Sequence, residues 1–173
     1  LCLLGSNISR FALGIWVYQQ TGSITQLGWA LTCEVLPTVL LAPVAGVVVD
    51  RGNRRTIMAV SDSLAALSTL GVYALMASGQ AEVWHVYLGT AAASAANAFQ
   101  SPAYLGAVAM MVPREHLGRA TGMTELAHGS SQLLAPALAG ALLAWFDVRV
   151  CVLLEVITCA VAVGLLLTVR FRS

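Results

Sequence analysis

Four charged residues stand close together at positions 50–55, and a long apolar stretch lies on each side of them. The segment reads Gly46-Val-Val-Val-Asp50-Arg51-Gly-Asn-Arg54-Arg55. A helix that crosses a lipid bilayer needs about 20 predominantly apolar residues, and both flanking stretches are long enough for that. The pattern therefore predicts a tight hydrophilic turn between two membrane-crossing helices.

The composition of the whole chain agrees with a membrane environment. Apolar residues make up 58% of the sequence and charged residues 10%, and the mean hydropathy is +0.81. An ordinary soluble domain contains about 25% charged residues. A water-soluble fold of this composition would have too little polar surface to cover itself, so the lipid bilayer is the expected solvent.

Charge and cysteine content exclude several kinds of partner. The net charge is only +1, so no nucleic acid or other polyanion is expected to bind. The cysteines fall inside apolar stretches and form no CxxC pair; they are Cys2, Cys33, Cys151 and Cys159. We therefore expect no metal site, no disulfide framework and no cofactor.

Apolar spans follow one another along the chain, with ends uncertain by about 2–4 residues. They cover residues 1–20, 26–49, 56–78, 83–112, 117–145 and 149–169. The connectors are short, so neighbouring helices must run antiparallel. The sequence therefore predicts an all-α membrane protein with six transmembrane helices. Because Leu1 already lies in an apolar run, we expect the chain to begin inside a helix.

Seven of the nine arginines lie on one side of this predicted arrangement. They occur in the second connector, around the fourth connector and after the last span, whereas the opposite connectors contain only Arg149. Short arginine-rich loops stay in the cytoplasm. We therefore predict a multi-pass protein of the inner (plasma) membrane with both visible termini in the cytoplasm.

A short internal echo divides the chain into two parts. Residues 40–43 and 133–136 both read Leu-Leu-Ala-Pro, and they are 93 residues apart. Three helices separate the two copies, so the copies cross the membrane in opposite directions. This arrangement is typical of a 3+3 inverted repeat. A chance match of four residues is the alternative.

The first span carries two polar residues on one helix face, Asn7 and Arg10. An ionisable side chain at membrane depth is costly unless it is paired or hydrated, which makes such residues functional candidates. We interpret Arg10 as a positive charge that faces an aqueous cavity and holds an anionic substrate or a carboxylate. The alternative is a structural arginine paired with Glu34 or Glu125.

Other polar residues at membrane depth are candidates for a substrate or proton pathway. Glu125, His128 and Gln132 share one face of the fifth span, and a carboxyl three residues from an imidazole can pass it a proton. The alternative for these residues is a hydrogen-bonded packing seam. Glu34 in the second span is a further proton-site candidate, and Asn97 in the fourth span is a candidate lining residue.

Two further carboxyl groups lie within the spans. Asp62 is about two helical turns from the arginine-rich loop, so we interpret it as a partner of those arginines. No role is assigned to Glu155.

The segment around Asp50 resembles the loop that follows the second helix in the major facilitator superfamily of transporters. The residues in its pattern are Gly46, Asp50, Arg51, Arg54 and Arg55, although the order Gly52-Asn53 departs from it. The resemblance implies that this loop acts as a latch that closes the cytoplasmic side. Asp50 and Arg51 would make the contacts with the other half, and Arg54 and Arg55 would support them.

Two further segments carry the resemblance. Residues 131–140 are similar to the fifth-helix motif of drug/proton antiporters, in which Pro136 and Gly140 match and Ala135 and Ala139 replace glycines. Residues 10–23 and 97–103 resemble the branch that contains enterobactin exporters and macrolide efflux pumps. The fourth-helix arginine of many family members is absent, so proton coupling through that residue is not expected.

The resemblance also implies what the chain does. Family members usually have twelve helices, so residues 1–173 are expected to be an N-terminal six-helix half, truncated at both ends, whose partner is a missing C-terminal half. The expected function is proton-driven efflux of small amphipathic molecules by alternating access. The alternatives are a membrane scaffold or sensor on the same fold, or an intramembrane enzyme. Enzymatic activity is not expected, because the sequence contains no HExxH or GxSxG motif.

Overall fold

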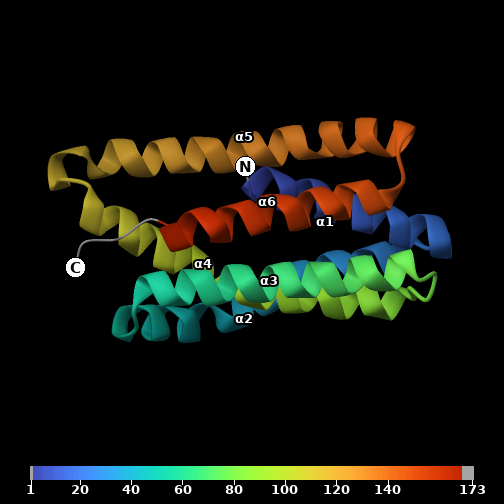
Figure 1. Cartoon of the computed structure of the whole chain (residues 1–173), viewed down its shortest axis with the longest axis horizontal. Coiled ribbons are helices and arrows are strands. Elements are labelled where there is room, and N and C mark those ends of the chain that lie inside the picture. Colours follow the sequence, from blue (N-terminus) through green and yellow to red (C-terminus); the bar gives the residue numbers. More distant parts are fainter. Residues whose placement is uncertain (1, 169–173) are drawn as a thin grey trace.

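The computed structural model describes residues 2–168, apart from the side chains at 2, 3, 55, 109, 111, 114, 162, 163 and 165–168, and these residues form an antiparallel bundle of long helices (Figure 1). The helices are α1 (Cys2–Thr21), α2 (Ile24–Arg51), α3 (Arg54–Ala77), α4 (Val83–Met111), α5 (Leu117–Trp145) and α6 (Val148–Thr168), with the short 3-10 helix η1 (Arg114–His116) before α5. Their ends differ from the predicted spans by at most two residues. The predicted all-α fold is confirmed.

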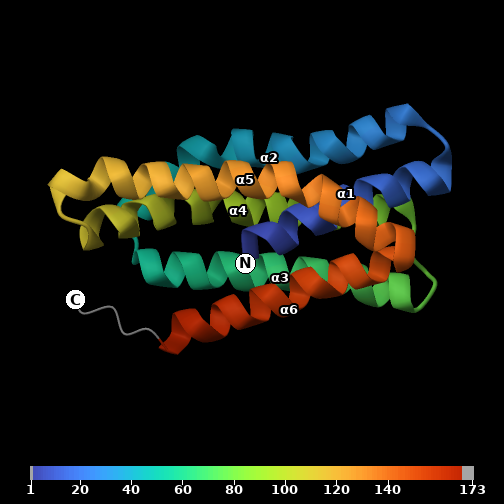
Figure 2. The ribbon, with the colours of Figure 1, turned by 90° about the horizontal axis from the view of Figure 1, so that it is seen from above.

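The connectors alternate between the two ends of the bundle (Figures 1 and 2). The α2–α3 and α4–α5 connectors share one end, which we call the basic end because Arg51, Arg54 and Arg119 lie there. The other three connectors share the opposite end, where Arg149 forms an ion pair with Asp147 at 3.3 Å. The predicted antiparallel order therefore holds along the described chain.

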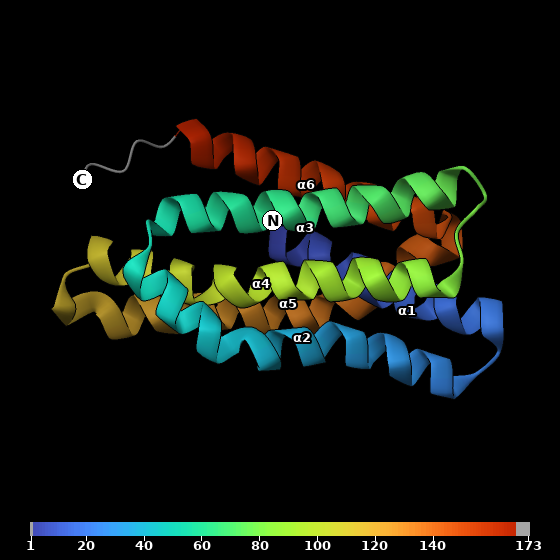
Figure 3. The ribbon, with the colours of Figure 1, turned by 90° about the horizontal axis from the view of Figure 1, so that it is seen from below.

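The packing of the helices follows a two-fold pattern. α4 packs mainly against α2 and α3, α1 packs mainly against α5 and α6, and α3 packs against α6 (Figure 3). Exchanging α1 with α4, α2 with α5 and α3 with α6 converts this set of contacts into itself. The contacts between helices therefore have the symmetry of the predicted 3+3 repeat.

Two interhelix hydrogen bonds show the same pattern. Thr38 Oγ1 of α2 lies 2.7 Å from Ser94 Oγ of α4, and Asn7 Nδ2 of α1 donates to Ser131 Oγ of α5 at 3.1 Å. These are equivalent helix pairs in the repeat. Thr38 and Ser131 are 93 residues apart (131 − 38), which is the interval of the Leu-Leu-Ala-Pro echo. One residue of each bond keeps this interval, which supports an inverted repeat over a chance match, whereas Asn7 and Ser94 are 87 residues apart (94 − 7).

The apolar core is centred on α1. Its buried residues come from α1, α3, α4, α5 and α6, and they are Ile8, Ala12, Leu13, Val17, Val72, Met76, Val86, Ala135, Ala139, Val148, Cys151 and Val152. Small side chains at the α5 positions allow α5 to approach α1 closely. The core therefore fixes α1 between the elements that carry the polar residues described below.

The outer faces of several helices are apolar. By length and composition, two helices of the described chain qualify as membrane spans: Ile24–Arg51 and Thr56–Ala77. Trp29 and Leu40 on α2 are 59% and 65% exposed, and Leu133 on α5 is 82% exposed. Large open apolar patches are rare on soluble monomers. These faces are suited to lipid or to another apolar surface.

Candidate functional site

The centre of the candidate site is an ion pair between α1 and α2. Arg10 Nη1 lies 3.3 Å from Glu34 Oε1, and the two side chains are 25% and 26% exposed. Glu34 is ten residues after Ile24 and 17 residues before Arg51 (34 − 24 and 51 − 34), so the pair is nearer the opposite end than the basic end. The arginine that the sequence placed at membrane depth therefore has a carboxylate partner.

Hydroxyl groups connect this pair to α4. The Ser94 hydroxyl donates to the backbone carbonyl of Glu34, and the Thr38 hydroxyl donates to the backbone carbonyl of Ser94 at 3.1 Å. Glu34 and Thr38 lie on either side of Pro37 in the sequence. Pro37 lies inside α2 and cannot donate a backbone hydrogen bond. The turn of α2 that carries Glu34 is therefore held by α4. Sequence reasoning did not single out Thr38, because isolated hydroxyls in apolar spans are common packing residues.

The predicted group on α5 lies on an exposed face. Glu125, His128 and Gln132 are all exposed, and His128 Nδ1 lies 3.4 Å from Gln132 Nε2. Within the described residues, no hydrogen bond joins Glu125 to His128. Asn7 bonds instead to Ser131, which is buried. The structure thus brings Asn7 to α5. The side chains of Glu125, His128 and Gln132 do not contact Arg10 or Glu34, and they form an exposed polar strip on α5.

Asn97 occupies the middle of α4, 14 residues after Val83 (97 − 83), and is partly buried. Its side chain makes no hydrogen bond within the part of the chain that the structure describes. An amide without an internal partner is available to a solute or to water. The role of Asn97 as a lining residue stays a prediction.

The loop between α2 and α3 has an exposed side and an anchored side. Asp50 and Arg51 are exposed, whereas Arg54 Nη1 donates to the backbone carbonyl of Gly106 on α4 at 2.6 Å. The Arg55 side chain lies outside the described residues, and Gly46 is partly buried without a close neighbour at its Cβ position. Arg54 is therefore bound inside this bundle, and Asp50 and Arg51 are the members of the motif that face outward.

Gly52 permits the sharp turn of this loop. Its N–H donates to the carbonyl of Val48 at 2.9 Å, and a Cβ atom added at Gly52 would lie 2.7 Å from the Ile57 side chain. The glycine is needed for close approach, because its φ of −100° is accessible to any residue. The departure from the family pattern at positions 52–53 is thus compatible with a tight turn.

Replacing Arg54 with glutamine should destabilise the bundle by about 1–3 kcal/mol, since a charged donor to a carbonyl contributes about that amount. Thermal unfolding of the chain in detergent micelles would measure the change. Arg51→Gln is the matched control, because Arg51 is exposed in the same loop. Equal unfolding temperatures for the two variants would contradict an anchoring role for Arg54.

In the fifth-helix motif, the two alanines pack against the core around α1, and the proline and glycine do not. Ala135 and Ala139 are 1% and 0% exposed and belong to the core around α1, whereas Pro136 and Gly140 are exposed. Residues four apart lie on the same helix face, so the two alanines form a narrow seam. Pro136 and Gly140 are on the side of α5 that no other described helix covers.

Two carboxyl groups are buried inside the bundle, and within the described residues Asp62 binds Gln100 instead of the arginine partner that we predicted. Asp62 of α3 is 7% exposed and accepts a hydrogen bond from the Gln100 amide of α4. Glu155 of α6 is 6% exposed and faces hydroxyl groups of α1 and α3. A carboxyl residue inside an apolar span is itself a signal, and it was present in the sequence at both positions. Together with the Arg10 pair, these are separate groups of polar contacts inside the bundle.

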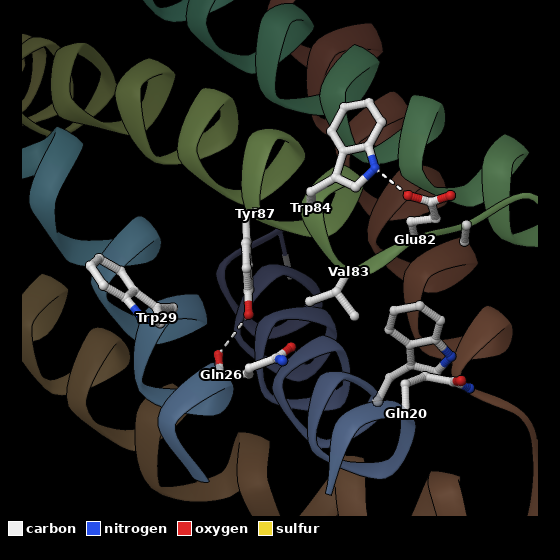
Figure 4. A pocket seen from close by; sticks show the side chains of 9 residues that line it. Gln20, Gln26, Trp29, Glu82, Val83, Trp84 and Tyr87 are labelled. Carbon is white, nitrogen blue, oxygen red and sulfur yellow. Dashed lines mark hydrogen bonds between the residues drawn. The ribbon is translucent and has the colours of Figure 1, made fainter. Parts of the chain in front are cut away.

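A pocket opens at the opposite end of the bundle, between the ends of α1, α2 and α4 (Figure 4). Its volume is about 710 Å³, and its lining includes Trp16, Gln20, Gln26, Trp29, Glu82, Val83, Trp84 and Tyr87. Trp84 Nε1 donates to Glu82 Oε2 at 2.5 Å, and the Tyr87 hydroxyl donates to the Gln26 carbonyl at 3.0 Å. Sequence reasoning missed this pocket, because its aromatic residues come from separate spans.

An all-helical bundle with apolar outer faces and paired charged groups between its helices is suited to a membrane. The profile of the Major Facilitator Superfamily matches residues 1–173, and the chain belongs to this superfamily. It is therefore a membrane protein of a transporter family. The family predicted from the loop motif is confirmed.

Characterised and uncharacterised transporters are among the relatives. Macrolide efflux protein A of Streptococcus pyogenes is 28% identical over 162 residues, which is 92% of this chain and 40% of that protein. Macrolide efflux protein A of Enterococcus faecalis is 29% identical over 137 residues, or 78% of this chain and 42% of the relative. The MFS-type transporter YfiS of Bacillus subtilis is 28% identical over 138 residues, or 79% of this chain and 32% of the relative. The chain thus spans less than half the length of these relatives. No solved structure matches it significantly.

Proposed function

We propose that this chain is the N-terminal six-helix bundle of a secondary transporter that exports small amphipathic molecules by alternating access, driven by protons. The observation that carries the proposal is the Arg10–Glu34 ion pair at 3.3 Å, held within an apolar bundle and still one quarter exposed. A partly buried charge pair that stays accessible can exchange partners when a solute or proton arrives. The names of the relatives favour a macrolide-like substrate.

In this proposal, the substrate and proton pathway runs along the polar faces of α1, α2, α4 and α5. Its residues are Asn7, Arg10, Glu34, Asn97, Glu125, His128 and Gln132. The exposed strip on α5 would face the second six-helix half, which would close the pathway from the other side. Apolar residues such as Leu133 beside this strip would then be covered by the partner half or by lipid.

The loop at the basic end is proposed as the cytoplasmic latch. Asp50 and Arg51 are exposed and would bind helix ends of the second half, and Arg54 would hold the loop in place through Gly106. The fifth-helix seam of Ala135 and Ala139 would keep α5 close to α1 while the halves rock. We propose that the basic end and both visible termini face the cytoplasmic side of the plasma membrane, because short arginine-rich loops stay in the cytoplasm.

The aromatic pocket at the opposite end would then lie on the outer side of the membrane. Its tryptophan rings offer flat apolar contact surfaces, and Gln20 and Gln26 add polar groups. Ligand pockets commonly have volumes of about 300–1,000 Å³ and combine these features. The pocket is therefore proposed as a contact region on the exit route.

The test requires the chain joined to the second six-helix half that the proposal assumes, reconstituted in proteoliposomes. An imposed pH gradient should drive a macrolide or an amphipathic dye across the membrane, and collapse of the gradient with a protonophore should stop the movement. Transport that ignores the gradient would contradict proton coupling. No movement across a broad substrate panel would favour a membrane scaffold or sensor instead.

A further inference from the structure

Glu155 is the most buried carboxyl residue among the described residues. This α6 residue is 6% exposed, and its carboxyl faces the hydroxyls of Ser6 and Ser9 on α1 and Thr69 on α3. These residues come from three helices that meet away from the exposed strip of α5. The proposed pathway does not use this cluster.

One member of the cluster is completely buried. This residue is Ser9, and among the described residues its hydroxyl faces the Glu155 carboxyl. Most buried polar side-chain atoms are hydrogen-bonded. A hydroxyl donates to an ionised carboxylate and accepts from a protonated one, so the same shell serves both states of Glu155 without rearrangement.

The other carboxyl groups within the helices have different neighbours. Arg10 holds Glu34 at 3.3 Å, and the Gln100 amide donates to Asp62. Glu125 is exposed to the surroundings of the bundle. A shell made mainly of hydroxyls distinguishes Glu155 from all three.

The charged groups around Glu155 are few. From α1 the facing charge is Arg10, which also binds Glu34, and from α3 the facing group is the neutral Thr69. Asp62 lies seven residues, or about two turns, from Thr69 along α3 (69 − 62). The ionisable α5 residues of the proposed pathway, Glu125 and His128, are exposed. Arg10 is thus positioned to interact with two carboxyl groups on different helices.

Close packing keeps the carboxyl against α1. A Cβ atom added at Gly5 would lie 3.4 Å from the Glu155 Cα and would collide with the Thr158 side chain. Glycine at this position therefore permits α1 and α6 to approach each other at the depth of Glu155. The backbones of α1 and α6 therefore lie close together beside the cluster.

We propose that Glu155 is the carboxyl that binds and releases the transported proton, with Arg10 as the link to Glu34. Hydronium from the aqueous phase supplies the proton, an O–H bond forms on the carboxyl, and water is left. When the proton departs to water, the ionised Glu155 competes with Glu34 for Arg10. This inference rests on the proposed proton-driven function, and it names the residue that couples the proton to the substrate pathway.

Infrared spectroscopy of the whole chain in lipid nanodiscs would test the inference without any transport. A pH titration should reveal a carbonyl stretching band of a protonated carboxyl in the unmodified chain. Glu155→Gln should remove that band, whereas Glu115→Gln, which changes an exposed carboxyl outside the proposed pathway by the same chemistry, should leave it. A band that persists in Glu155→Gln, or the absence of a titrating band in the unmodified chain, would overturn the proposal.

Two further variants cover the case in which Glu155→Gln does not fold. Glu155→Asp keeps a titratable group and should shift the band, and Thr69→Val removes one hydroxyl and should move the pH at which the band titrates. Unchanged spectra in both folded variants would reject the assignment. Transport by the joined two-half protein is measured separately, so a titrating Glu155 band without transport would refute the proposed function alone.

Discussion

Replacing Arg10 with methionine is expected to destabilise the bundle by about 2 kcal/mol, and replacing Glu34 with methionine should have a similar effect. Each change leaves the opposite charge without its partner, and an unpaired charge near the centre of a membrane span costs about 2.5–3.5 kcal/mol. Partial exposure of the two side chains, 25% and 26%, allows some hydration and lowers the cost. The double replacement should recover most of the loss, because neither charge remains.

Unfolding of the four proteins in the same detergent would measure this double-mutant cycle, and residues in contact typically give an interaction energy of about 0.5–3 kcal/mol. Arg149→Met and Asp147→Met form the matched control cycle. That pair has the same 3.3 Å separation, but its side chains are 49% and 62% exposed. Exposed pairs contribute little, so the control cycle should show almost no coupling.

Two results would contradict this account of the Arg10 pair. Additive effects of the single replacements would mean that the two charges are stabilised independently. A double variant less stable than either single variant would mean that the side chains are needed for packing rather than for charge compensation. In the joined transporter, Arg10→Met should also abolish gradient-driven movement if the proposed pathway is correct.

The second large effect is expected from Gly89→Leu in α4, with a loss of about 3 kcal/mol or more because an overpacked helix interface must shift. A Cβ atom at Gly89 would collide with the side chain of Val72 on α3, and it would lie 3.7 Å from the Ser68 carbonyl. Val72 is 5% exposed and branched at Cβ, so it has no free space or rotamer to move into. The α3–α4 interface should therefore separate.

Gly71→Leu is the control for this substitution. Gly71 lies on α3 close to Val72 in sequence, but a Cβ atom there would meet nothing within 4 Å. The same residue change should be neutral or slightly stabilising, because leucine has a higher helix propensity than glycine by about 0.8 kcal/mol. Circular dichroism during heating would compare the two variants. Equal melting curves would show that α3 and α4 do not approach each other as described.

The helices were predictable because the chain separates polar and apolar residues so sharply. Charged or glycine-containing connectors such as residues 50–55 interrupt apolar spans, and backbone groups at membrane depth must be satisfied within a helix. The observed ends of α2 and α5 therefore fall close to the predicted ones. The inverted repeat was visible in four identical residues and reappears in the packing of the helices.

The candidate site was predictable only in part. An arginine and a glutamate in adjacent antiparallel helices indicated that Arg10 and Glu34 could meet, and they do. Spacing along α5 grouped Glu125 with His128, but helical spacing does not reveal whether a face points inward. The partners of Asp62 and Glu155 belong to other helices, so no local pattern could identify Gln100 or Ser9.

The sequence by itself determined that this protein is helical, where its helices begin and end, and which superfamily it belongs to. These properties depend on local composition and on short motifs, which can be recognised without knowing how the helices pack. Only the tertiary structure decided which polar groups lie together inside the bundle and which face outward, as with Arg54 bound to Gly106 beside the exposed Asp50. The physical reason is that a hydrogen bond between helices depends on their rotation and separation, and many packed side chains set both at once.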